Sequence, residues 1–136
     1  MKKTIFAVLM FFCVICCAFA EEAFFANRNT ALRYLKLAQD YVLKSQWDSV
    51  LSSAEIGLTY DSSLADLWYV KSIAESQTQE KPYIIIENLE KSLDREWVSY
   101  NPRGAKILLA NYYYATMEYE KALSLLDDKT LLLNSE

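Results

Sequence analysis

The sequence predicts an all-α fold in which antiparallel helix pairs follow an N-terminal signal peptide. Beyond residue 20, apolar residues recur at helical spacing, and no alternating pattern typical of strands persists over several residues. The chain of 136 residues contains only two glycines and two prolines, so helix-breaking residues are scarce. The helical segments are separated by short connections, which favours antiparallel packing of neighbouring helices.

Residues 1–20 have the pattern of a signal peptide. Lys2 and Lys3 are followed by an uncharged apolar run over residues 4–17, and Ala18 and Ala20 place small residues where a signal peptidase reads them. The apolar run is shorter than the roughly 20 residues that span a membrane. We therefore expect cleavage after Ala20 and export to the periplasm, with secretion or outer-membrane association as alternatives.

The three cysteines, Cys13, Cys16 and Cys17, all lie within the predicted signal peptide. A bacterial lipoprotein needs a small residue before its acceptor cysteine, whereas Phe12, Ile15 and a cysteine precede these three. Membrane attachment is therefore expected only if one of them is lipidated against this pattern.

Composition excludes several classes of function for the segment after residue 20. It has neither Cys nor His, so it lacks the ligands of common zinc and haem sites and the groups of thiol- or His-based catalysis. Gly57 and Gly104 are too far apart for a glycine-rich phosphate loop. The acidic formal charge of −4 becomes two units more negative without the signal peptide, which disfavours nucleic acid. We therefore expect that the protein is not an enzyme and that it binds neither a cofactor nor a metal ion.

A lead-in over residues 21–30 precedes the first predicted helix at 31–43. A second helix is predicted over the segment from Trp47 to Leu58. These two segments repeat apolar or small residues at helical spacing: Leu32, Leu35, Leu37, Ala38, Tyr41 and Val42 in the first, and Trp47, Val50, Leu51, Ala54 and Leu58 in the second.

Start signals indicate the later helices. Ser62 and Ser63 are expected to cap a third helix, with Asp66 as the reciprocal acid of a capping box. Pro82 suits the first turn of a fourth helix. Asn101 followed by Pro102 predicts the cap and first residue of a fifth, which extends to about residue 116, and a sixth covers about 118–127.

The helices fall into three repeated units over residues 31–64, 65–102 and 103–136. When the units are aligned, small residues coincide in their first helices at Ala38, Ser72 and Ala110. We expect these residues at close contacts between helices, with Gly57 and Ser92 in the same role on second helices.

The aligned units resemble the tetratricopeptide repeat, whose first helix follows W-x2-L-G-x2-Y. The first unit carries Tyr34, Leu37, Ala38 and Tyr41 at these positions, and the third carries Leu109, Ala110 and Tyr113 before the family-like stretch over residues 117–123. Lys71, Glu75 and Lys106 depart from the pattern. The resemblance covers residues 31–136 and implies a right-handed solenoid whose first helices line a concave groove.

The resemblance implies a non-catalytic scaffold of the bacterial cell envelope that binds another protein or peptide. Its concave groove would be lined by Leu35, Gln39, Val42, Tyr69, Ile73, Asn111 and Tyr114. Two alternatives remain open: a periplasmic carrier or transporter-accessory protein that holds a small apolar ligand in this tyrosine-rich groove, or a further repeat that covers part of the surface.

The connection over residues 94–101 is longer than the family norm and contains Trp97 and Tyr100. Both residue types are frequent binding anchors, so they are additional candidates for partner contact. The alternative is that Trp97 fills the gap created by the insertion.

The third unit ends where the chain ends, without a polar capping helix. We expect a longer repeat protein, or an end completed by a partner, by a second copy, or by residues 131–133 folding back over Leu125 and Leu126.

Overall fold

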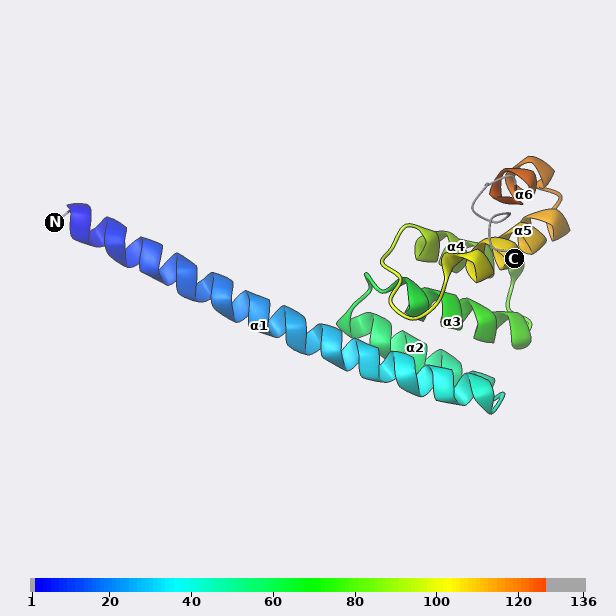
Figure 1. Ribbon diagram of the computed structural model, residues 1–136, viewed down its shortest axis with the longest axis horizontal. Helices are drawn as coiled ribbons and strands as arrows, with labels where there is room; N and C mark the ends of the chain where they lie inside the picture. Colours follow the sequence, from blue (N-terminus) through cyan, green and yellow to red (C-terminus); the bar gives the residue numbers. More distant parts are fainter. Residues whose placement is uncertain (1, 127–136) are drawn as a thin grey trace, which may run out of the picture.

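The computed structural model describes the backbone of residues 2–126 and the side chains of residues 23–126. Within the described backbone, the chain is all-helical and contains no strand, as the sequence predicts (Figure 1). The predicted lead-in at residues 21–30 lies inside the first helix, because that segment contains no glycine or proline to end it. The helices are α1 (Lys2–Leu43), α2 (Trp47–Tyr60), α3 (Ala65–Gln77), α4 (Pro82–Leu93), α5 (Pro102–Ala115) and α6 (Tyr119–Leu126).

The helices pack in consecutive pairs, α1 with α2, α3 with α4, and α5 with α6. Each helix also contacts the next one along the chain, and α1 contacts α3. Figure 1 shows the pairs following one another across the body, while the N-terminal part of α1 extends beyond it. This order of contacts is consistent with a helical repeat.

The turns inside the three pairs share one backbone conformation. Each contains a non-glycine residue with positive φ: Ser45 at 54°, Gln79 at 61° and Met117 at 65°. The intervals between these positions equal the intervals between the aligned small residues of the first helices. The next residue in each turn donates its N–H to a carbonyl five residues back, namely Gln46 to Tyr41, Glu80 to Glu75 and Glu118 to Tyr113, as in a Schellman motif.

Small residues occupy the expected close contacts. Ala38 and Ser72 are fully buried and Ala110 is 3% exposed. At Gly57, an added Cβ would lie 2.9 Å from a methyl carbon of Leu67 and 3.2 Å from the Cβ of Tyr34, so a larger residue would push helices apart.

The core consists of two groups of buried side chains. The first joins α1, α2 and α3, and the second joins α4, α5 and α6. Their largest members are Leu35, Val50, Leu64, Leu67 and Val70 in the first group, and Ile85, Leu89, Leu109 and Tyr113 in the second.

Two of the three predicted helix starts are confirmed. Pro82 is the first residue of α4, and the Asn101 side chain caps α5 by accepting the N–H of Arg103 at 2.8 Å. The capping box predicted for α3 is wrong. That helix follows Leu64, which makes no side-chain cap, and the carboxylate of Asp66 binds a distant loop instead.

The run at residues 131–133 lies outside the described residues, as do the side chains of the predicted signal peptide. The adjacent acidic residues Asp127 and Asp128, for which the sequence suggests no catalytic role, lie outside them too. Among the residues searched, no helix is both long enough and apolar enough to cross a membrane.

Candidate binding groove

The predicted groove residues have very different exposures. Leu35 is only 2% exposed and belongs to the first core group, so in this structure it offers almost no surface to a partner. It is buried because α3 packs on this side of α1. Val42 is half-buried and packs against the same core.

The remaining groove candidates on α1 and α3 are Gln39, Tyr69 and Ile73, and all three are half-buried. On α5, Asn111 is exposed and Tyr114 is 68% exposed. Exposure along the predicted groove is therefore greatest at the third helix pair.

The long connection at residues 94–101 packs against two of the groove candidates, Gln39 and Tyr69. The ring of Tyr69 meets the ring of Trp97 edge-on at 5.8 Å and the ring of Tyr100 edge-on at 5.4 Å. The side chain of Gln39 hydrogen-bonds to Tyr100. The two sets of candidates predicted separately, in the groove and in the loop, are therefore in contact with each other.

Both tyrosine hydroxyl groups in this aromatic cluster are held in their neutral form. Burial raises the pKa of Tyr69, and the neighbouring Tyr100 raises it further. Burial is also the main cause of the raised pKa of Tyr100. The hydroxyl of Tyr69 lies against Gly104, where an added Cβ would approach within 2.5 Å of the oxygen. Gly104 therefore leaves room for Tyr69 beside the first turn of α5.

Asp66 fixes the loop at its centre. Its carboxylate is fully buried and accepts the backbone N–H groups of Val98 at 2.8 Å, Ser99 at 2.9 Å and Tyr100 at 2.6 Å. Three hydrogen bonds satisfy a buried charge that would otherwise be strongly unfavourable. The capping-box pattern singled out Asp66. That pattern does not show whether the carboxylate binds the start of its own helix or, as here, a loop far away in the sequence.

The beginning of the loop is also attached to the first two pairs. Glu96 exchanges two backbone hydrogen bonds with the segment around the start of α3, at Ser63 and Ala65. Arg28 on α1 reaches both Glu96, at 2.8 Å, and Asp61, at 3.3 Å. The loop is thus part of the folded structure. Trp97 packs beside the second core group, which agrees with the alternative that it fills the gap created by the insertion.

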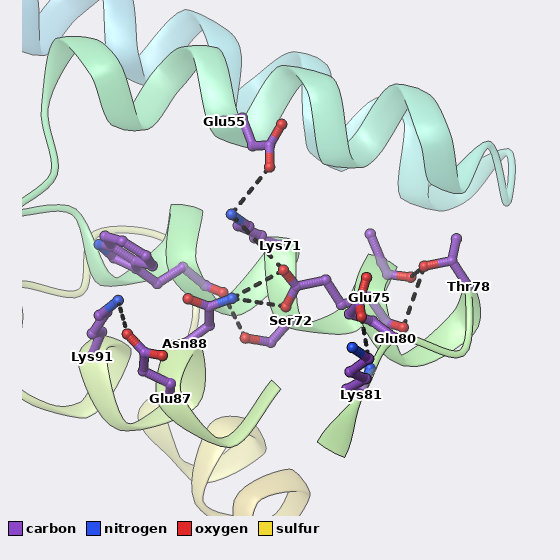
Figure 2. A network of polar contacts seen from close by, with 12 residues as sticks. Glu55, Lys71, Ser72, Glu75, Thr78, Glu80, Lys81, Glu87, Asn88 and Lys91 are labelled. Carbon is purple, nitrogen blue, oxygen red and sulfur yellow. Dashed lines mark hydrogen bonds and ion pairs between the residues drawn. The ribbon is translucent and has the colours of Figure 1, made fainter. Parts of the chain in front are cut away.

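A buried polar network, which the sequence did not predict, links the second pair to the first (Figure 2). Both carboxylate oxygens of Glu75 accept hydrogen bonds from the side-chain nitrogen of Asn88, at 3.0 and 2.8 Å. Lys71 lies 3.8 Å from Glu75 and 3.1 Å from Glu55 on α2. Lys71 and Glu75 are among the residues that depart from the family pattern. These charged residues at positions where the pattern has other residue types were the only indication of the network in the sequence.

The surroundings of Glu75 in this network shift its pKa. Burial raises the pKa of Glu75, which is 5% exposed, although Asn88 and Lys71 act in the opposite direction. The carboxylate faces the interior between α3 and α4 (Figure 2), so it cannot reach a ligand in the groove. We assign it a structural role.

The described surface has open depressions. One of about 400 Å³ lies among α4, α5 and α6. Tyr113 borders it and donates a hydrogen bond to Glu90, and burial followed by this carboxylate raises the pKa of the Tyr113 hydroxyl. Among the residues searched, no three His, Cys, Asp or Glu side chains are grouped so as to hold a metal ion.

No protein-family model matches this chain, and a comparison with curated proteins found no significant match.

Proposed function

We propose that this protein is a non-catalytic interaction module of the bacterial cell envelope, exported by residues 1–20, that binds a peptide or protein segment. The proposed architecture is a right-handed solenoid similar to the tetratricopeptide repeat. The repeated turn at Ser45, Gln79 and Met117 supports this architecture, because it recurs at the spacing of the aligned helices.

The observation that carries the binding proposal is the loop packed over the first helices. An irregular segment of protein chain lies there with Trp97 and Tyr100 against Tyr69, held through its backbone N–H groups by Asp66. This is the kind of contact that a bound peptide makes, with aromatic anchors and main-chain hydrogen bonds together. The same surface continues uncovered at Asn111 and Tyr114.

The exposed groove candidates Asn111 and Tyr114 offer an amide and an aromatic side chain. An amide can bind a peptide backbone through both its donor and its acceptor groups. The depressions described above are open to solvent, whereas a small apolar ligand is usually enclosed by its pocket. A peptide or protein partner therefore fits this surface better than a small ligand.

Site-specific photo-crosslinking in the native envelope tests this proposal. A photoreactive residue at position 111 should give a discrete adduct with another protein, since Asn111 is exposed in the groove. The matched control is position 56, where Ile56 is 41% exposed on α2, a second helix of its pair. Adducts of equal yield and identity at both positions, or none at position 111, would contradict binding in the groove.

The export proposal has a separate test. Intact-mass measurement of the protein from the envelope should give a chain that begins at Glu21. A mass that retains the segment from Met1 to Ala20 would contradict cleavage, and a lipid-modified cysteine would place the protein on a membrane.

A further inference from the structure

The last described helix pair exposes a continuous apolar surface, which we call the rear face. It consists of Ile107 and Tyr114 on α5 and Tyr119, Leu123 and Leu126 on α6, which are between 42% and 68% exposed. Tyr114 also belongs to the uncovered part of the groove, so self-association and peptide binding would compete for this side chain. Residues spaced by three, four or seven share one side of a helix. The rings of Tyr114 and Tyr119 meet edge-on at 5.4 Å and join the two helices' contributions into one surface.

The equivalent positions in the earlier pairs are covered. When the units are aligned on their small residues, Ile107 corresponds to Leu35 on α1 and Tyr69 on α3. Leu35 is buried in the core that α1 shares with α3, and Tyr69 packs against the loop and Gly104 of α5. The rear face is thus the equivalent of the side of each earlier pair against which the following segment of the chain packs.

The opposite side of the first pair carries three charged side chains beside the partly exposed Leu37. At the start of α3 and along it, the residues directed to the preceding pair are apolar and buried: Leu64, Leu67, Val70 and Ala74. The aligned residues on α1 are Thr30, Arg33, Lys36 and Asp40. The last three of these are exposed. Packing this polar side against a rear face would bury three charged side chains against apolar residues, which is strongly unfavourable.

We propose that the rear face binds the rear face of a second copy of this chain, with two-fold symmetry. A two-fold contact places each residue near its own equivalents, so it tolerates apolar side chains and disfavours like charges. All five rear-face residues are uncharged. Of the charged residues beside them on α6, Glu118 and Lys121 form an ion pair at 2.5 Å, and Glu120 is exposed. The polar side of α1 favours this closed dimer over a head-to-tail chain.

The size of the rear face sets the strength of the contact. Two faces, each with two tyrosines and three aliphatic residues, would remove on the order of 1,000 Å² from water in total, near the lower limit for specific interfaces. The dimer should therefore dissociate in the micromolar range, and its population should depend on protein concentration.

The first test measures molar mass by light scattering over a range of concentrations, using protein purified after expression of the full chain. The mass should rise from that of the monomer to twice that value. Leu123→Glu should weaken the dimer at least about tenfold, because it would bury a charge in the contact. Leu43→Glu is the matched control: Leu43 is 85% exposed at the end of α1, so this variant should behave like the parent.

Single-cysteine variants test the symmetry. With Cys13, Cys16 and Cys17 replaced by alanine, a cysteine introduced at residue 114 or 123 should form a disulfide with its own copy under mild oxidation. A cysteine at residue 36 should not. A monomer at all concentrations up to about 1 mM, a dimer unaffected by Leu123→Glu, or open-ended oligomers linked through residue 36 would each overturn the proposal.

Discussion

The buried carboxylate of Asp66 accepts the backbone N–H of Tyr100 at 2.6 Å, although the two residues lie 34 positions apart in the chain. The same carboxylate accepts the N–H groups of Val98 and Ser99. A single acidic side chain in the first turn of α3 therefore holds the centre of the loop that packs on part of the groove.

Replacing Asp66 with alanine should destabilise the protein by about 3 kcal/mol, because three N–H groups lose a charged acceptor inside the protein. Thermal unfolding would measure this loss. Hydrogen exchange should show that the amides of residues 98–100 lose protection more than those of α2.

The matched control is Asp40→Ala. Asp40 is exposed on α1, so this variant should differ from the parent by less than about 0.5 kcal/mol. Equal losses in the two variants, or unchanged exchange at residues 98–100, would show that Asp66 does not hold the loop.

Much of the fold could be predicted because it depends on local sequence. Helical spacing and the start signals at Pro82 and Asn101 act within a few residues of the helices they specify. The small residues Ala38, Ser72 and Ala110 are informative for the same reason, since close packing of paired helices admits only small side chains there.

The groove could be predicted only in part, because its exposure depends on segments far away in the sequence. Leu35 and Tyr114 were both predicted on the groove side of first helices, yet one is buried by the next helix pair and the other is exposed. The contacts of Asp66 with residues 98–100 and of Glu75 with Asn88 link different elements, and helical periodicity contains no information about such pairings.

Ala110→Leu tests the helix contact in the third pair. Ala110 is 3% exposed within the second core group, so the additional methyl groups should overpack it and cost about 1–3 kcal/mol. Chemical unfolding measures the change. Ala115→Leu, at an exposed position at the end of the same helix, should change stability by less than about 0.5 kcal/mol. If Ala110→Leu unfolds like the parent, the alignment of the third unit is wrong.

Met117→Gly should stabilise the protein by about 0.5–1 kcal/mol. Met117 has a φ of 65° and is 75% exposed, so glycine relieves an unfavourable backbone conformation while little apolar contact is lost. Ala115→Gly, two residues earlier at the end of α5, should slightly destabilise, because its backbone has no positive φ to relieve and glycine is a poor helix former. Thermal unfolding of both variants should show shifts of opposite sign, and shifts of the same sign would contradict the shared turn conformation.

Glu75 should make stability depend on pH in the direction opposite to that of an ordinary ion-paired carboxylate. Burial raises the pKa of Glu75 in the folded protein above its unfolded value, against the effects of Asn88 and Lys71 and together with nearby Glu80 and Glu55. Between the unfolded and folded pKa values the folded state binds more protons, so the free energy of unfolding falls as the pH rises through this window.

The variant Glu75→Gln isolates the contribution of Glu75 to the pH dependence of stability from the contributions of the other ionisable groups. Glutamine is neutral at every pH and keeps an oxygen that can accept a hydrogen bond from Asn88, so the variant should be more stable than the parent at pH 7. The difference should vanish below about pH 4, where the glutamate is protonated in both states. Glu87→Gln is the control, because an exposed hydrogen bond with Lys91 lowers the pKa of Glu87, so its removal should slightly destabilise at pH 7. Urea unfolding of the three proteins at pH 4 and 7 measures these differences, and a Glu75→Gln variant less stable than the parent at pH 7 would show that the charged form of Glu75 is favoured inside the fold.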